Sequence, residues 1–373
     1  MPSQVLIVPD KFKGTLTATA AAAAIDHGWR QARPRDILRC LPMSDGGDGF
    51  GEILSQRLQA NPQSTPTVDA AHRPLVARWW WAPKTRTAII ESAKVIGLAW
   101  LPPHQFHPFD LDTFGLGAVL EAAARKGARR CLIGIGGSAT NDAGFGLARA
   151  LGWTFWDRDG EPIDRWTRLN ALARLQPPRK RRLFTTTIVA VDVQNPLLGP
   201  QGCSRIYGPQ KGLRPEDFLH AEQCLRRLAF VAGRSEWPHR AAQPGAGAAG
   251  GLGYGLSVFL GAQLKSGFDM FARHARLSQH LRSADLVITG EGALDQSTLM
   301  GKGVGEVALQ CRRWQVPCIG VAGLAQDRAQ LQKRFSQIHA ISPDLTSAEN
   351  SQAEPARWLA ILARRIAAAF PDR

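Results

Sequence analysis

The sequence predicts an α/β protein of two domains, in which both chain ends build a parallel-sheet domain and the middle of the chain is inserted as a second α/β domain. Short β-branched runs are followed by glycine-containing turns and then by helical segments, an alternation that is typical of α/β folds. This pattern opens the chain and returns in its last third. The length of 373 residues is sufficient for two domains with sizeable cores.

The first strand is predicted at Val5–Val8, and the polar turn Pro9–Gly14 separates it from an Ala-rich helix over Ala18–Arg30. Thr15 or Thr17 is expected to cap this helix, because a threonine hydroxyl can accept a hydrogen bond from a free N–H group of the first turn. A strand, a turn and a helix in this order form the first α/β unit.

The last third of the chain repeats this order. Asp285–Thr289 ends in a continuous apolar run, Gly303–Trp314 has helical character, and Pro317–Val321 contains a second buried run. Apolar strands are typical of parallel sheets covered on both faces, so these two runs and Val5–Val8 are predicted to share one sheet. Pro355–Phe370 is predicted to be a closing amphipathic helix, since a proline is tolerated in the first helical turn.

The middle of the chain has a different composition. It holds the tryptophans Trp79–Trp81, the connection at Pro177–Pro178 and the most glycine-rich stretch, Pro244–Gly255. We therefore predict a discontinuous first domain over residues 1–75 and 284–373, with residues 76–283 inserted as the second domain. A cleft between two such domains is the expected ligand site.

The net charge of +15 comes from 46 Lys and Arg against 31 Asp and Glu. These positive charges are dispersed, form one run at 179–182, and accompany no nucleic-acid-binding motif, so we expect no nucleic-acid partner. A basic nucleic-acid binder remains the non-enzymatic alternative, and it predicts binding with a steep salt dependence. The absence of a membrane-length apolar run and of a signal-peptide pattern predicts a cytoplasmic protein without a membrane partner. The six cysteines form no C-x-x-C pair, and we expect reduced, packed thiols.

Six loops combine glycine with carboxylate, lysine or amide side chains. Glycine lets backbone N–H groups approach an anion, and lysine adds a positive charge. Carboxylates beside such loops can hold Mg²⁺ or accept a proton from an attacking hydroxyl. The loops lie at 5–14, 41–51, 131–146, 192–212, 244–255 and 285–303.

Each loop also has a structural interpretation. Asp45 and Asp48 can form a polar turn, Glu291 and Asp295 can cap the helix that follows them, and Ser138 can do the same. The stretch 245–250 matches G-x-G-x-x-G, but a proline precedes it where a dinucleotide-binding fingerprint needs a strand. Neither a P-loop nor the protein-kinase motifs occur, so a phosphate-handling enzyme of another design is predicted.

Taken in order, seven of these segments resemble the glycerate kinase type-1 family. They are PDKFKG (9–14), MSDGGDG (43–49), GIGGSATNDAGFG (134–146), DVQNPLLGPQG (192–202), YGPQKG (207–212), GAGAAGGLGYG (245–255) and TGEGALD (289–295). The resemblance implies a flavodoxin-like domain with an inserted mixed α/β domain. It also implies transfer of the γ-phosphoryl group of ATP to D-glycerate with Mg²⁺, usually at the 2-hydroxyl, giving 2-phosphoglycerate.

In that reaction, the candidate catalytic residues are Lys13, Asp192 and Lys211, and the candidate metal ligands are Asp45, Asp48 and Asp295. The lysines are assigned to the transferring phosphate or the substrate carboxylate, and Asp45 and Asp192 to Mg²⁺ and general base, either way round. The candidates for binding substrate or nucleotide are Asp10, Gly46, Gly47, Gly136, Gly137, Ser138, Thr140, Asn141, Asp142, Asn195, Gln210, Gly247, Gly250, Glu291 and Lys302.

Two enzymatic alternatives stay open. The same loops would serve a phosphatase or a sugar-phosphate enzyme, which ATP turnover only in the presence of glycerate would distinguish. The same kinase could also give 3-phosphoglycerate. Neither the motifs nor the resemblance indicates an oligomeric state.

Overall fold

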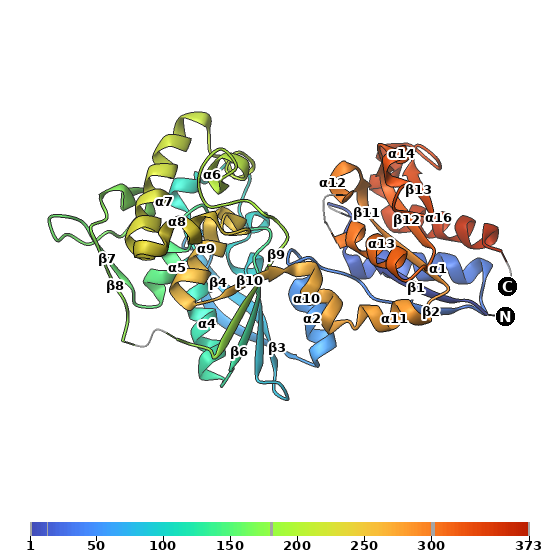
Figure 1. Ribbon diagram of the computed structural model, residues 1–373, viewed down its shortest axis with the longest axis horizontal. Helices are drawn as coiled ribbons and strands as arrows, with labels where there is room; N and C mark the ends of the chain where they lie inside the picture. Colours follow the sequence, from blue (N-terminus) through green and yellow to red (C-terminus); the bar gives the residue numbers. More distant parts are fainter. Residues whose placement is uncertain (1, 13, 180–181, 300–302, 372–373) are drawn as a thin grey trace. The chain divides into compact units, whose positions relative to one another are not determined.

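The computed structural model describes residues 2–12, 14–179, 182–299 and 303–371. The chain divides into two compact units, and the first contains both ends of the chain, residues 1–45 and 268–373. The second unit is residues 46–267. Figure 1 shows this division by colour, since the blue start and the red end of the chain belong to the same unit. The predicted two-domain α/β architecture is thereby confirmed.

The observed unit boundaries differ from the predicted ones after residues 75 and 283. Residues 46–75 belong to the second unit because they contain the helix α2 (Phe50–Leu58) and the strand β3 (Asn61–Val68), and β3 pairs along its whole length with β4 (Pro74–Ala82). The helix α11 (Leu277–Ser283) belongs to the first unit, where it contacts β1 (Gln4–Pro9).

A five-stranded parallel sheet forms the centre of the first unit, with the strand order β13-β12-β11-β1-β2. Counted within this unit, the order is 2-1-3-4-5, which is that of flavodoxin-like folds. The three strands predicted to share one parallel sheet do so as β1, β11 and β12. The remaining bounds are β2 (Ile37–Cys40), β11 (Leu286–Leu294), β12 (Cys318–Ala325) and β13 (Gln337–Ser342).

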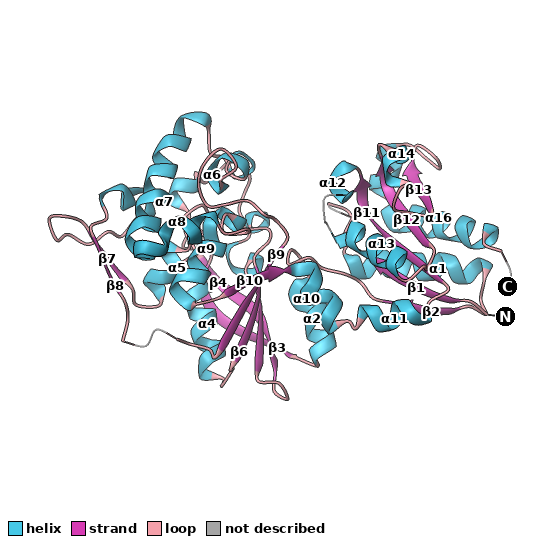
Figure 2. Ribbon diagram, viewed as in Figure 1, coloured by secondary structure: helices cyan, strands magenta, loops and turns pink. Residues whose placement is uncertain are grey.

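Helices cover this sheet, as Figure 2 shows. The helices α1 (Ala18–Ala32) and α16 (Pro355–Ala369) pack against each other and share a core with alternate strand residues such as Ile7 and Ile288. The hydroxyl of Thr17 caps α1 by accepting from the N–H of Ala20 at 3.1 Å, as one of the two predicted caps. The other helices are α10 (Gly267–His274), α12 (Gln296–Leu299), α13 (Gly303–Arg313), α14 (Arg328–Leu331) and α15 (Ala348–Ala353).

The second unit has a six-stranded mixed sheet in the order β10-β9-β6-β5-β4-β3. The strands β3, β4 and β5 are antiparallel neighbours, whereas β5, β6, β9 and β10 run parallel. Trp79 and Trp80 are buried in β4, as expected for core residues. The further strands are β5 (Thr87–Glu91), β6 (Arg130–Gly134), β7 (Thr154–Trp156), β8 (Arg174–Gln176), β9 (Thr186–Val191) and β10 (Gln263–Ser266).

Helices and short 3₁₀ turns connect these strands. The α-helices are α3 (Ala93–Ile96), α4 (Leu116–Arg125), α5 (Phe145–Ala150), α6 (Cys203–Ile206), α7 (Phe218–Gly233), α8 (Trp237–Ala242) and α9 (Ala248–Leu260). The 3₁₀ turns are η1 (Leu98–Trp100), η2 (Pro108–Asp110), η3 (Trp166–Ala171), η4 (Pro209–Lys211), η5 (Pro215–Asp217) and η6 (Arg234–Glu236). Among the described helices, none combines the length and the apolar character that crossing a membrane requires. All six cysteines are free thiols, and Cys40 is the one that is not fully buried.

The contact between α1 and α16 predicts an unusual effect of a glycine substitution. A Cβ atom on Gly28 would lie 2.0 Å from the carbonyl oxygen of Ala360. Gly→Ala inside a helix normally stabilises by about 1 kcal/mol, but the clash makes Gly28→Ala destabilising, by about 1–3 kcal/mol. Urea unfolding measures this change. The exposed helix position Ala23→Gly is the control and is expected to cost about 1 kcal/mol from propensity alone. A stabilised Gly28→Ala variant would contradict the close packing.

Candidate functional site

Acidic side chains gather at the carboxyl edge of the first unit's sheet. Asp10 follows β1 directly, and its N–H donates to the carbonyl of Gly290 in the neighbouring strand β11 at 2.8 Å. The next residue of β11 is Glu291. The segment after β2 runs along the end of β1, where the N–H of Met43 donates to the carbonyl of Pro9 at 2.9 Å, and it leads to Asp45. The strand order reverses between β1 and β11, which is where ligands bind in parallel sheets of this kind.

Asp10 is a buried carboxyl group in this cluster. Burial raises its pKa well above the usual value, the negative charges of Asp45 and Glu291 raise it further, and Lys11 opposes them. The N–H of Lys11 also donates to the Asp10 carboxylate at 2.7 Å. Three negative groups therefore repel one another at this edge, and their oxygen atoms suit a hard divalent cation such as Mg²⁺. Within the described residues, no three His, Cys, Asp or Glu side chains are placed as a metal-binding group.

Asp295 directly follows the strand β11 and precedes the helix α12. The N–H of Asp295 donates to the hydroxyl of Thr298 at 3.3 Å. The carbonyl of Asp295 accepts from the N–H of Thr298 at 3.1 Å. The Thr298 hydroxyl also donates to Glu291 at 2.9 Å, so these contacts connect the start of α12 to the acidic cluster. The predicted lysines Lys13 and Lys302 lie outside the described residues.

In the second unit, three parallel strands end side by side at Glu91, Gly134 and Val191. The glycine loop 46–49 packs across these ends. The N–H of Gly136 donates to the carbonyl of Gly46 at 3.1 Å, and a Cβ on Gly136 would lie only 2.6 Å from the Cα of Gly47. The predicted glycines 46, 47, 136 and 137 are thus neighbours, with the exposed Asp48 close to Gly137.

Lys211 at the end of η4 is a buried lysine, with 7% of its surface exposed. Its ammonium group donates to the backbone carbonyl of Thr140 at 2.7 Å. Burial lowers the pKa of Lys211 to about 8, against the opposing effects of Cys203 and Asp142. In the part of the chain that the structure describes, no carboxylate forms an ion pair with it. Lys211 is therefore a buried cation whose hydrogen-bond partner is a neutral carbonyl.

Asn141 lies beside this contact and is fully buried. Its side-chain amide donates to the hydroxyl of Ser204 at 2.9 Å, while its Oδ1 is buried with no hydrogen-bond partner among the described residues. Gly250 has a positive φ of 68° and packs so closely that a Cβ there would lie 1.9 Å from the Thr140 carbonyl oxygen. Ser138 and Thr140 share a hydrogen bond at 3.0 Å between their hydroxyls.

A further set of predicted residues surrounds Asn195. The hydroxyl of Tyr207 donates to the Asn195 side chain at 2.6 Å, and the N–H of Gly247 donates to the Asn195 carbonyl at 2.9 Å. Burial and the negative charge of Asp192 raise the pKa of Tyr207 to about 12, so Asp192 lies near this group. Asp192 itself is exposed directly after β9, and Gln210 is exposed in η4.

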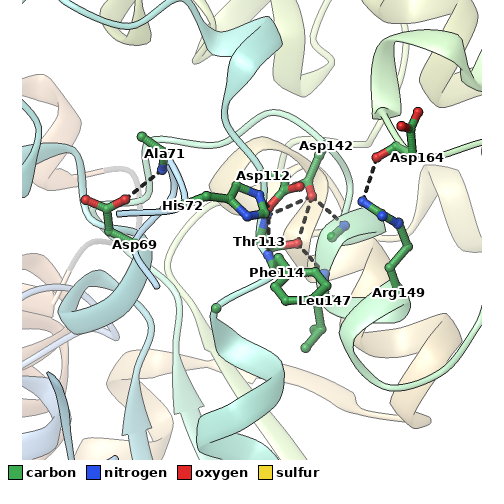
Figure 3. A network of polar contacts seen from close by, with 12 residues as sticks. Asp69, Ala71, His72, Asp112, Thr113, Phe114, Asp142, Leu147, Arg149 and Asp164 are labelled. Carbon is green, nitrogen blue, oxygen red and sulfur yellow. Dashed lines mark hydrogen bonds and ion pairs between the residues drawn. The ribbon is translucent and has the colours of Figure 1, made fainter. Parts of the chain in front are cut away.

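Asp142 caps the helix α5 and is completely buried. Its carboxylate accepts from the N–H of Thr113 at 3.0 Å, the hydroxyl of Thr113 at 2.7 Å, the N–H of Gly146 at 2.9 Å and that of Gly144 at 3.3 Å. Figure 3 shows Asp142 and Thr113 facing each other in this network. Burial, and then the charge of Asp112, raises the pKa of Asp142 to about 6. Helix capping, considered above for Ser138, is performed by Asp142.

The structure thus brings most predicted residues of the second unit to one sheet edge, and Asp10, Asp45 and Glu291 to the sheet edge of the first. Sequence reasoning missed Glu91 and Thr113. Glu91 had a usable signal, because it is a carboxylate that ends the apolar run Ala88–Ile90, the same signal that identified Asp192. Thr113 had none, because its role depends on a residue 29 positions away.

A model of the glycerate kinase family matches residues 5–371 of the chain. The chain belongs to the glycerate kinase family. This family consists of kinases, so the resemblance inferred from the seven segments is confirmed.

Relatives in the family match along most of their length. A glycerate kinase of Halalkalibacterium halodurans is 34% identical over 370 residues, covering 97% of both chains. The glycerate 2-kinase of Escherichia coli K12 is 36% identical over 330 residues, covering 87% of this chain and 86% of its own. A crystal structure from Salmonella typhimurium LT2, whose chain is assigned as a glycerate kinase 2, has a TM-score of 0.80 and 33% identity and covers 98% of this chain and 97% of its own.

The capping network predicts that Asp142 is important for stability. Asp142→Ala leaves several buried N–H and O–H donors without an acceptor and is expected to lower the free energy of unfolding by at least about 3 kcal/mol. Asp142→Asn retains one acceptor oxygen, and its loss should be smaller. Thermal or urea unfolding measures both. The exposed Asp110→Ala, which removes a surface ion pair with Arg165, is the control and should cost less than about 1 kcal/mol. Equal losses for Asp142→Ala and Asp110→Ala would contradict the assignment.

Proposed function

We propose that this protein transfers the γ-phosphoryl group of ATP to the 2-hydroxyl of D-glycerate, giving 2-phosphoglycerate and ADP, in the cytoplasm and with Mg²⁺. The observation that carries the proposal is the buried Lys211 ammonium at a glycine-lined sheet edge, in a chain of the glycerate kinase family. The 2-position is supported by the E. coli relative, which is named a glycerate 2-kinase.

Lys211 binds an anionic group in this proposal. A buried ammonium whose hydrogen-bond partner is a neutral carbonyl is only partly compensated, by the nearby charge of Asp142, and a carboxylate or a phosphoryl oxygen would neutralise it. The unpartnered Oδ1 of Asn141 lies in the same loop and is an acceptor for a hydroxyl donor. D-glycerate carries both kinds of group, which supports an α-hydroxy carboxylate as the substrate class.

The carboxylates divide into two roles. Asp45, Asp48 and Asp295 remain the candidate ligands of Mg²⁺, and Asp10 and Glu291 lie in the same acidic cluster as Asp45. When bound, Mg²⁺ would neutralise charge on the phosphate oxygens of ATP. Asp192 follows the buried strand β9 and is exposed, so it is proposed as the general base for the substrate hydroxyl or as a further metal ligand.

The glycine loops serve the nucleotide. Gly46, Gly47, Gly136 and Gly137 pack backbone against backbone because they have no side chains, and we propose that a phosphate of the nucleotide binds beside these loops. We infer that Asp142 supports the loop from behind rather than touching the ligand, because both of its oxygens accept hydrogen bonds from Thr113 and α5. Lys13, Lys302, Ser138, Gln210, Gly247 and Gly250 remain candidate binding or catalytic residues.

The first test of the proposal is the product itself. Incubation with ATP, Mg²⁺ and D-glycerate is expected to give 2-phosphoglycerate, identified by ³¹P and ¹H NMR. ATP turnover should require D-glycerate, so a mixture without the acid is the control. Formation of 3-phosphoglycerate would overturn the assignment of the 2-hydroxyl, and loss of phosphate from phosphorylated compounds without ATP would instead support a phosphatase.

The pKa of Lys211 predicts the alkaline limit of activity. The free enzyme holds the ammonium form below pH 8 and loses it above, so kcat/KM for D-glycerate is expected to fall about tenfold per pH unit beyond about pH 8. D-glycerate and ATP do not change charge in this range. A pH profile from 7 to 10 measures the effect. Lys211→Met should be strongly impaired at every pH, whereas the exposed Lys84→Met should match the wild type. A flat wild-type profile would exclude Lys211 as the essential cation.

A further inference from the structure

Glu91, at the end of β5, holds the start of α2 through its carboxylate. One oxygen accepts from the N–H of Gly49 at 3.3 Å and the other from the N–H of Gly51 at 3.0 Å. The residue at the N-cap position of α2, Gly49, has no side chain with which to cap the helix. Glu91 is 2% exposed and 40 positions away from Gly51 in sequence, so it is a cap supplied from the sheet.

The loop held in this way lies tightly on the sheet. A Cβ on Gly51 would lie 1.9 Å from the ring of Trp80, and a Cβ on Gly134 would lie 2.7 Å from the carbonyl oxygen of Gly46. The Gly46 carbonyl also accepts from the N–H of Gly136. The loop is therefore fixed at both of its ends, by Gly136 at one and by Glu91 at the other.

Glu91 is a buried carboxylate with charged groups of both signs nearby. Burial raises the pKa of Glu91, the N–H groups of Gly51 and Gly49 lower it, and the negative charge of Asp48 makes the last and smallest contribution, which raises it. Lys94 offsets part of this at 3.8 Å. Two neighbouring carboxylates repel each other, so Glu91 holds the loop while its charge opposes that of Asp48.

We propose that Glu91 is a positioning residue for phosphoryl transfer, which holds the loop 46–49 and its carboxylate Asp48 at the end of the sheet. The role of Glu91 in phosphoryl transfer rests on the proposed function, whereas its role in fixing the loop does not. Glu91 acts through the backbone of Gly49 and Gly51 and does not touch the substrate. Small displacements of such a loop cost about tenfold to a hundredfold in rate.

The first measurement is hydrogen exchange of the Gly49 and Gly51 amides in the protein without ATP, Mg²⁺ or glycerate. Glu91→Gln replaces one accepting oxygen by an NH₂ group that faces an N–H donor. Exchange at these amides is therefore expected to accelerate at least tenfold. Glu121→Gln makes the same chemical change on α4, where Glu121 is half-buried and pairs with Arg125, and should leave both amides unchanged.

The second measurement is kinetic. In Glu91→Gln, kcat/KM for ATP and for D-glycerate is expected to fall about tenfold to a hundredfold, while Glu121→Gln keeps the wild-type values. Glu91→Asp keeps the charge but has a side chain one methylene shorter. Its kcat/KM values should lie between those of Glu91→Gln and those of the wild type. In the double variant Asp48→Asn with Glu91→Gln, the fall in kcat/KM should be smaller than the product of the two single falls. The reason is that Glu91 acts by positioning the Asp48 carboxylate, which the first substitution removes.

The outcomes separate the two proposals. A wild type that does not phosphorylate D-glycerate overturns the proposed function, and the exchange measurement still tests the loop. Faster exchange in Glu91→Gln with wild-type kinetics overturns positioning in favour of a structural role. Unchanged exchange with lost activity, or fully multiplicative losses with Asp48→Asn, overturns action through the loop. Should Glu91→Gln fail to fold, the same comparisons are made with Glu91→Asp.

Discussion

Direct contact between loop backbone and strand ends is the constraint on which the site of the second unit depends. A side chain on Gly250 would collide with the Thr140 carbonyl oxygen, and one on Gly136 would collide with Gly47. The Thr140 carbonyl that Gly250 approaches is the same one that accepts the 2.7 Å hydrogen bond from Lys211, so a side chain on Gly250 would displace this acceptor. The glycines are therefore required for close approach, and Gly250 also for its positive φ.

Buried charges in this protein are stabilised in different ways, and the difference separates support from chemistry. Asp142 and Glu91 each accept at least two hydrogen bonds from backbone N–H groups. These bonds compensate for the free-energy cost of removing the carboxylates from water, and they connect segments that are distant in sequence. Lys211 has a neutral carbonyl as its partner, and Asp10 is surrounded by further negative charge. Groups of the second kind gain most from a charged ligand, so they are the better candidates for contact with substrate and metal.

Sequence patterns predicted the positions of several candidate site residues because their polar side chains come directly after buried strands. Asp10 and Asp192 each come after a buried strand, and parallel strands bring such ends together. Glu91 also ends a strand, but the sequence offers no sign that its partners are Gly49 and Gly51. The unit boundary at Asp45 was equally invisible, because nothing local shows that β3 pairs with β4 rather than with the first sheet.

The sequence by itself determined the strands β1, β11 and β12 and the helices α1, α13 and α16 of the first unit, the glycine loops and the family. These follow from hydrophobic periodicity, from glycine and proline, and from residues that are adjacent in the chain. The tertiary structure alone decided which carboxylates cap helices, which cluster together, and why Lys211 has a lowered pKa. Burial and hydrogen-bond partners depend on residues far apart in sequence, as Lys211 and Thr140 are by 71 positions, and only the folded chain brings them into contact.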